Sequence, residues 1–143
     1  MGNIVELNRA RVFTIEEVEQ ILPVVRRITD EYFEKLQGLM GRLEALRLRD
    51  DKQSESAFNA IEKEINDNVQ AWQTKLEKLG AQTKGLWIAD FDSGDGYFCW
   101  KYPEDRIRYW HQYNDGFRGR ILLEKKSVSS GELPALREGS PEL

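Results

Sequence analysis

Two long series of apolar residues with the same spacing constrain the fold of this chain more than any other feature of its sequence. The first series steps by 3, 4, 4, 3, 4 and 3 residues and comprises Val25, Ile28, Tyr32, Leu36, Leu39, Leu43 and Leu46. The second series repeats the same steps and comprises Phe58, Ile61, Ile65, Val69, Trp72, Leu76 and Leu79. Because residues three and four apart share one face of an α-helix, both segments are predicted to be long amphipathic helices.

The segment between the two series is short and polar, and it reads Asp50-Asp51-Lys52-Gln53-Ser54. Its composition is typical of a loop, and a short connection places consecutive helices side by side in antiparallel directions. Gly80 follows the second series directly, at the position where a glycine commonly ends a helix. We therefore expect one long antiparallel helical hairpin, from about residue 14 to about residue 80.

The segment FTIEEV at residues 13–18 carries the signals of a helix start. Thr14 and Glu17 are spaced as a capping box. Pro23 follows, and it lacks the amide proton that a helix interior requires. Either the helix kinks at Pro23, or Pro23 is the first residue of a second helix. We favour the second arrangement, which predicts a short leading helix that ends near Leu22.

The hydrophobic period changes after the hairpin. Three segments rich in aromatic and β-branched residues follow, separated by turn-like stretches, and they are Leu86–Phe91, Tyr97–Tyr102 and Arg106–Gln112. They predict a three-stranded antiparallel β-meander within about residues 86–123. We expect the aromatic residues of this region mainly to pack the sheet against the hairpin.

These elements predict an α+β fold: a long antiparallel helical hairpin with a short leading helix, plus a small three-stranded antiparallel β-meander. The chain has 143 residues, which is the usual size of one domain, and we place that domain at residues 1–124. Residues 125–143 are rich in Ser, Gly, Pro, Glu and Lys, so we expect a disordered C-terminal tail there.

Charge and composition exclude several classes of protein. The chain has 21 basic and 25 acidic residues, a formal charge of −4 and no basic block, so no nucleic acid partner is expected. No apolar run approaches the ~18 residues of a membrane-spanning helix, so no membrane association is expected. Cys99 is the only cysteine, which excludes a disulfide within the chain and favours a cytoplasmic location.

Two helices alone do not enclose both apolar stripes, so the rest of the chain or another copy must cover them. Gly38 and Gly41 lie three residues apart in the first long helix. Each costs about 1 kcal/mol relative to alanine in a helix interior. They are either tolerated surface glycines or the point where two helices cross closely. The second interpretation predicts a homodimer.

Three stretches carry a resemblance to a known family. They read FTIEEVEQILP at residues 13–23, FCWKYPEDRIRYWH at residues 98–111 and GFRGR at residues 116–120. On these motifs the chain resembles a bacterial family catalogued as domain of unknown function 2203, over about residues 13–123. That family has no established activity, so the resemblance supports the fold and implies no function.

One short block gathers the residue types that carry chemistry. His111 is the only histidine, and histidine is suited to the roles of general acid, general base or metal ligand. Period-2 alternation places Tyr109 and His111 on one face of the third predicted strand and Cys99 on a face of the second. If those faces meet, Cys99 and His111 would form a reactive thiolate–imidazolium pair. The alternative is that His111 is a structural hydrogen-bonding residue and Cys99 a small buried apolar residue.

Arg118 and Arg120 lie beside Gly116 and Gly119, a pattern that suits an anion-binding loop. The alternative is a glycine-dependent turn whose arginines pair with nearby acidic residues such as Asp115 or Glu104. The candidate ligand or anion site therefore comprises His111, Arg118, Arg120, Cys99 and Tyr109.

No metal site within one chain is expected, because a zinc site needs three or four ligands and the chain offers one Cys and one His. Carboxylates such as Glu104 or Asp115 would have to supply the rest. A site shared across a dimer interface stays an alternative. The sequence identifies no cofactor.

We expect a non-enzymatic cytoplasmic interaction or regulatory protein that self-associates through its hairpin, because no complete catalytic constellation is present. A protein partner fits this expectation as well as a second copy does. The alternative is a protein, enzymatic or not, that binds a small molecule, an anion or a metal at the end of the sheet around His111, Arg118 and Arg120.

Overall fold

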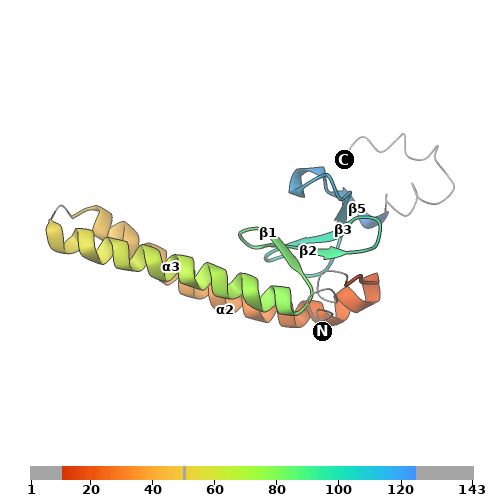
Figure 1. Ribbon diagram of the computed structural model, residues 1–143, viewed down its shortest axis with the longest axis horizontal. Coiled ribbons are helices and arrows are strands. Elements are labelled where there is room, and N and C mark those ends of the chain that lie inside the picture. The colour runs from red at the N-terminus through yellow and green to blue at the C-terminus, as the bar shows by residue number, and fades with distance from the viewer. Residues whose placement is uncertain (1–10, 50, 125–143) are drawn as a thin grey trace, which may run out of the picture.

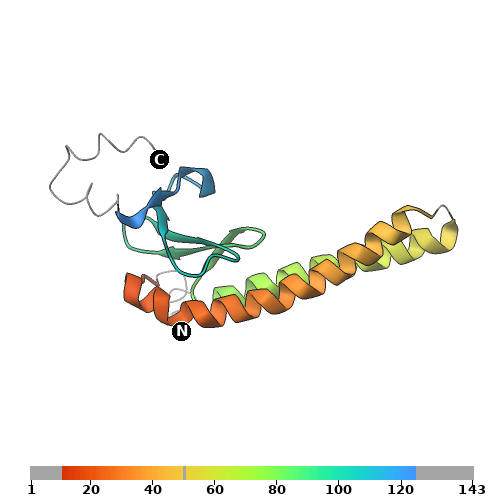
Figure 2. The same cartoon turned by 180° about the vertical axis from the view of Figure 1, so that it is seen from behind.

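The computed structural model describes residues 11–49 and 51–124, in which a helical hairpin carries an antiparallel sheet near one end (Figure 1; Figure 2). This arrangement confirms the α+β class and the hairpin. In chain order the elements are α2 (Ile15–Arg47), α3 (Lys52–Lys78), β1 (Gln82–Gly85), β2 (Ile88–Asp92), β3 (Tyr97–Lys101), β4 (Tyr109–His111), the 3-10 helix η1 (Phe117–Gly119) and β5 (Ile121–Leu122). No helix within the described ranges is long and apolar enough to cross a membrane. The disordered tail expected at residues 125–143 lies outside the described residues.

Helix α2 begins with the expected capping box and continues past Pro23. The Glu17 N–H donates to Thr14 Oγ1 at 3.1 Å, and the Thr14 N–H donates to Glu17 Oε1 at 2.9 Å. The prediction of a separate leading helix is wrong, because Pro23 lies inside α2. Pro23 is exposed and Leu22 and Val25 are buried, so apolar packing maintains the helix where the proline removes one backbone hydrogen bond. Figure 1 shows the first turns of α2 bent away from the rest, as a proline within a helix causes.

Helix α3 begins earlier than the sequence predicts. The Asp51 carboxylate accepts a hydrogen bond from the Ser54 N–H at 2.6 Å, and the Asp51 N–H donates to Ser54 Oγ at 3.4 Å. This reciprocal cap places residues 52–54 in the helix and shortens the predicted loop. The other end agrees with the prediction: Gly80 has a φ of +99°, and its N–H donates to Glu77 O at 2.9 Å.

A buried polar contact joins the two helices within an apolar seam. Trp72 Nε1–H donates to Thr29 Oγ1 at 2.9 Å, and the Thr29 hydroxyl donates to Val25 O at 2.8 Å. Both side chains are fully buried, among apolar neighbours of the same core such as Tyr32 and Leu76. The two predicted stripes therefore face each other, and the threonine satisfies the one polar group that Trp72 brings into the seam.

The sheet has five antiparallel strands in the order β1-β2-β3-β4-β5, so the prediction of three strands is corrected. The three predicted strands correspond to β2, β3 and a shortened β4. Strand β1 reads Gln-Thr-Lys-Gly, a sequence without apolar alternation, and it is a strand because its backbone pairs with β2. Strand β5 contains only two residues. Trp87, which the sequence places in a strand, lies in the tight turn before β2 with a φ of 69°.

Alternation along the strands gives the sheet two different faces. One face packs on the helices in the common core and contributes Ala89, Phe91, Phe98, Trp100 and Trp110. The turn between β2 and β3 packs just as closely, because a Cβ on Gly96 would lie 2.2 Å from Trp110 Cζ2. The opposite face of the sheet carries a set of buried polar residues on β2, β3 and β4.

Replacement of Thr29 by valine tests the polar contact in the seam. Valine keeps the shape of threonine but leaves the Trp72 indole N–H buried without an acceptor. We expect the free energy of unfolding to fall by about 1–3 kcal/mol, measured by chemical denaturation. In a Trp72→Phe background the same replacement should cost much less, because the donor is gone. An equal cost in both backgrounds would contradict a role for this hydrogen bond.

Candidate functional site on the outer face of the sheet

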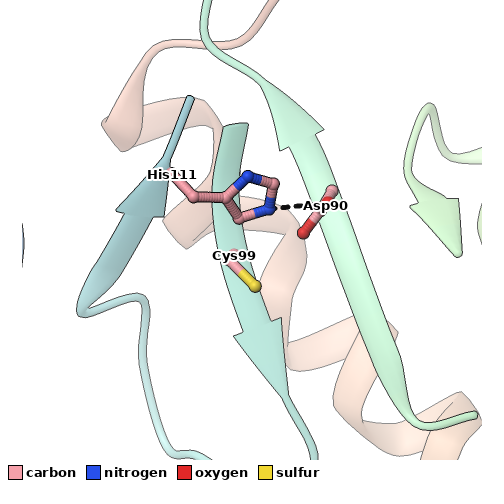
Figure 3. A group of neighbouring side chains, drawn as sticks. All are labelled: Asp90, Cys99 and His111. Carbon is pink, nitrogen blue, oxygen red and sulfur yellow. Dashed lines mark hydrogen bonds and ion pairs between the residues drawn. The ribbon is translucent and has the colours of Figure 1, made fainter. Parts of the chain in front are cut away.

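Three polar side chains meet on the face of the sheet that points away from the helices. Asp90 on β2 pairs directly with Cys99 on β3, and His111 on β4 pairs with Tyr97, two residues from Cys99. Because alternate residues of a strand share a face, this register brings Asp90, Cys99 and His111 together. Figure 3 shows the three side chains turned toward one another in front of the strands. Each is at most 2% exposed.

The hydrogen bonds of His111 define the charge of this cluster. Nδ1 lies 2.8 Å from Gln112 O, and Nε2 lies 2.9 Å from Asp90 Oδ2. A carbonyl oxygen only accepts, so Nδ1 carries a proton and donates it. One further proton lies between Nε2 and Oδ2, and either the imidazole or the carboxyl group holds it. The His111–Asp90 pair is therefore neutral overall.

Cys99 is a poor nucleophile in this environment. Its side chain is fully buried, and burial raises the pKa of the thiol, with the negative charge of Asp90 adding to the effect. A thiol with a raised pKa keeps its proton at neutral pH, and the thiolate is the reactive form. Cys99 and His111 do approach each other, as their alternation allows, but not as a reactive thiolate–imidazolium pair.

A lysine and a tyrosine lie against the cluster. Lys84 Nζ lies 3.8 Å from Asp90 Oδ2 and 4.3 Å from the centre of the Tyr97 ring. The Tyr97 ring lies 5.5 Å from the His111 ring, centre to centre. Asp90 Oδ1 is buried and has no hydrogen-bond partner among the described residues. In that part of the chain it is the only buried side-chain nitrogen or oxygen atom without one. Buried polar atoms are normally satisfied, so this oxygen requires an explanation.

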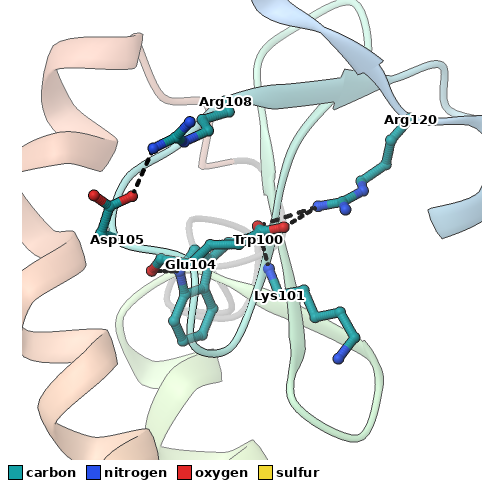
Figure 4. Close-up of polar contacts among 6 residues, drawn as sticks. All are labelled: Trp100, Lys101, Glu104, Asp105, Arg108 and Arg120. Atoms are coloured by element: carbon teal, nitrogen blue, oxygen red, sulfur yellow. Dashed lines mark hydrogen bonds and ion pairs between the residues drawn. The ribbon is translucent and has the colours of Figure 1, made fainter. Parts of the chain in front are cut away.

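Arg120 belongs to a second group, which is shown in Figure 4. Its Nη1 donates to both carboxylate oxygens of Glu104, at 3.1 and 3.0 Å. Its guanidinium group lies 3.9 Å from the centre of the Tyr109 ring and 4.1 Å from that of Phe117. The Glu104 carboxylate also accepts from the Lys101 N–H at 2.8 Å. Arg120 therefore has a structural role, as in the alternative in which the arginines pair with nearby acidic residues. Glu104 already balances its positive charge.

Arg118 lies apart from both groups. It is exposed on η1, and no ion pair joins it to another residue of the described chain. The five candidate residues thus divide into Cys99 with His111, Tyr109 with Arg120, and Arg118 alone.

Asp90 completes the cluster and is not among the five candidate residues predicted from the sequence. A weak signal is present in β2 (Ile88–Asp92), where Asp90 stands between two apolar residues, Ala89 and Phe91. An aspartate at such a position is rarely left buried unless a partner satisfies it. The register between β2, β3 and β4 was needed to identify that partner as His111.

The chain belongs to the family described as an uncharacterized conserved protein (DUF2203), which matches residues 11–123. This confirms the family resemblance. No curated protein matches the chain. No solved structure matches it either.

Unfolding at alkaline pH tests the environment of Cys99. Because the pKa of the thiol is raised in the folded protein, the folded chain retains this proton where the unfolded chain loses it. The resulting stabilisation is complete below pH ~9 and is lost above it, by up to about 1.4 kcal/mol per pH unit. The difference in free energy of unfolding between the wild type and Cys99→Ala should therefore shrink from about pH 9 to about pH 10. A difference that does not change with pH would contradict this.

Replacement of Arg120 by methionine tests its ion pair, and Arg118→Met is the matched control. Arg120→Met leaves the largely buried Glu104 carboxylate without its cation. The free energy of unfolding should fall by about 2 kcal/mol, which is less than the roughly 3–5 kcal/mol cost of breaking a fully buried pair because both side chains keep some exposure. Arg118→Met should change it by less than about 0.5 kcal/mol. Similar values for the two variants, measured by thermal or chemical denaturation, would refute the structural assignment of Arg120.

Proposed function

We propose that this chain is a non-enzymatic interaction protein of the cytoplasm, and that it forms a homodimer through the outer surface of α2. The observation that carries the proposal is the pair of exposed glycines in that helix, Gly38 and Gly41. Nothing in the part of a single chain that the structure describes accounts for them.

The hairpin extends well beyond the sheet in both views (Figure 1; Figure 2). Its apolar stripe is less well covered toward the tip: Leu36 and Leu39 are buried, whereas Leu43, Leu46 and Phe58 are half-buried. The projecting part therefore rests on the contact between α2 and α3 alone. A long helical arm of this kind offers a large surface for association.

A side chain at Gly38 or Gly41 would enter open space. A Cβ built at either position meets nothing within 4 Å, so neither glycine is needed for contact with α3 or the sheet. Each still costs about 1 kcal/mol in a helix interior. A second copy that crosses here in a two-fold, antiparallel manner would set Gly38 of each chain against Gly41 of the other. The absence of side chains would then allow the two backbones to approach closely.

The cluster on the sheet supports a non-enzymatic assignment. Cys99 and His111 are both buried, and the thiol retains its proton. Arg120, the one candidate anion ligand with a fixed position, is engaged by Glu104. These groups match a structural network better than a set of catalytic residues awaiting a substrate.

Two substitutions at the glycine pair separate folding from association. The double substitution Gly38→Ala and Gly41→Ala should stabilise α2 of a single chain by about 1 kcal/mol at each position, because alanine favours a helix more than glycine does. Gly38→Leu with Gly41→Leu should leave the fold intact, because both positions face open space. The leucines should nevertheless raise the dimer dissociation constant at least about tenfold, or by ~1.4 kcal/mol. Multi-angle light scattering over a range of concentrations measures this constant.

The control is Gln20→Leu, which adds the same side chain at an exposed position of α2 far from the glycines. It should leave the dissociation constant unchanged. A monomeric wild type would refute the proposal, and so would a dimer that the two leucines do not weaken.

A further inference from the structure

The three polar residues on the outer face of the sheet form a set of donors that suits a transition metal. A thiol, an imidazole and a carboxylate each offer one ligand atom, and these atoms lie within 4.8 Å of one another. In a tetrahedral site with bonds of about 2.0–2.3 Å, ligand atoms are ~3.3–3.7 Å apart. Adjustments of about 1 Å would bring the Asp90, Cys99 and His111 ligand atoms to that spacing.

The orientation of His111 is that of a metal ligand. Its Nδ1–H donates to Gln112 O at 2.8 Å, which leaves Nε2 directed at the cluster. Histidines that bind metals commonly donate their other ring N–H to a backbone carbonyl in this way, and the contact fixes both the tautomer and the ring.

Asp90 Oδ1 supplies an independent observation. It is a buried oxygen without a hydrogen-bond partner in the part of the chain that the structure describes, on a residue that is 1% exposed. One Asp90 oxygen contacts His111 Nε2 and the other has no partner among the described residues, so the carboxylate has a free acceptor. A bound cation would satisfy it.

The charge of the cluster also permits a divalent ion. Without metal, the cluster holds one proton between His111 and Asp90 and another on the Cys99 sulfur. A divalent ion that binds Sγ, Nε2 and a carboxylate oxygen replaces both protons, and they leave to solvent. Two positive charges enter and two leave, so the buried face carries no additional charge.

We propose that Asp90, Cys99 and His111 bind a divalent transition metal ion of the zinc type, with one protein ligand from each of the strands β2, β3 and β4. Thiolate and imidazole favour such ions over magnesium or calcium, which prefer oxygen ligands. Three protein ligands leave the fourth tetrahedral position to water or another small ligand. The site lies within one chain and does not depend on the proposed dimer.

Lys84 places a positive charge beside the cluster. It is exposed, and it lines a groove of about 720 Å³ between the end of α3 and β1. Its ammonium group stands 3.8 Å from Asp90 Oδ2, where it competes with a cation for the carboxylate. Removal of this charge should strengthen metal binding.

The test uses the full-length, untagged protein, stripped with a chelator and titrated with Co²⁺ as a spectroscopic probe. The wild type should develop a thiolate-to-cobalt charge-transfer band that saturates at one ion per chain, and Zn²⁺ should displace it. Cys99→Ser should lose the band. Asp90→Asn and His111→Gln should weaken binding at least about 100-fold, because each replaces a carboxylate or imidazole ligand with a neutral amide that binds zinc-type ions poorly. Lys84→Met should strengthen it about tenfold, because a nearby positive charge is gone.

Two measurements keep the test decisive if a ligand variant fails to fold. Zn²⁺ should raise the melting temperature of the wild type and of Lys84→Met, and it should slow the reaction of Cys99 with a thiol reagent in partially denaturing conditions. The proposal fails if neither protein develops the band, or if Co²⁺ binds Cys99→Ser as tightly as the wild type. Binding without a thiolate band, as surface carboxylates would give, also overturns it.

Discussion

The alternation of side chains along β2, β3 and β4 is the constraint on which the rest of the structure depends. The face that meets the hairpin must be apolar, and it takes Ala89, Phe91, Phe98, Trp100 and Trp110. Every residue between them is then directed to the opposite face, whatever its chemistry. Once Phe91 and Trp100 are buried against the helices, Asp90 and Cys99 can lie only on the opposite face of the sheet. The position of the polar cluster therefore follows from the packing of the core. A shift of one residue in register would exchange the two sets and destroy both.

The helical part of the fold was predictable because its signals are local and repeated. Seven apolar positions at helical spacing define each long helix, and Thr14 and Gly80 mark two of the four ends. Pro23 misleads because its local preference favours a break, whereas burial of Leu22 and Val25 around it favours continuity. Burial is a tertiary effect, and it outweighs a single missing hydrogen bond. Strand β1 also depends on a tertiary effect. Its own sequence carries no strand signal, and it is a strand only because its backbone pairs with β2.

The candidate site was predictable in part. The sequence points to His111 and Cys99 by their rarity, and alternation allows them to share a face, which they do. It does not single out Asp90, because Asp92 at the end of the same strand and Asp95 in the turn that follows are aspartates too, and apolar neighbours on both sides are too weak a signal to separate them. Only the pairing of strands separates a buried carboxylate from exposed ones. For Arg120 the sequence pattern suggests a site that the structure does not leave free. The glycine-rich segment around Arg120 suits an anion-binding loop, but the Glu104 carboxylate already pairs with its guanidinium group.

The continuity of α2 has a mechanical consequence. Its 33 residues form one continuous helix, about 50 Å long when measured along its bent axis, that begins under the sheet and ends at the tip of the hairpin. In the proposed antiparallel dimer, which crosses near Gly38 and Gly41, this helix would act as a spacer: the two sheets would lie at opposite ends of the assembly, and helix length rather than a flexible linker would set their separation. Any pair of partners bound to the two sheets would be held at a fixed distance. Equal insertions or deletions in α2 and α3, which pack together along this stretch, would change that distance by about 5.4 Å per helical turn on each side, without altering either sheet.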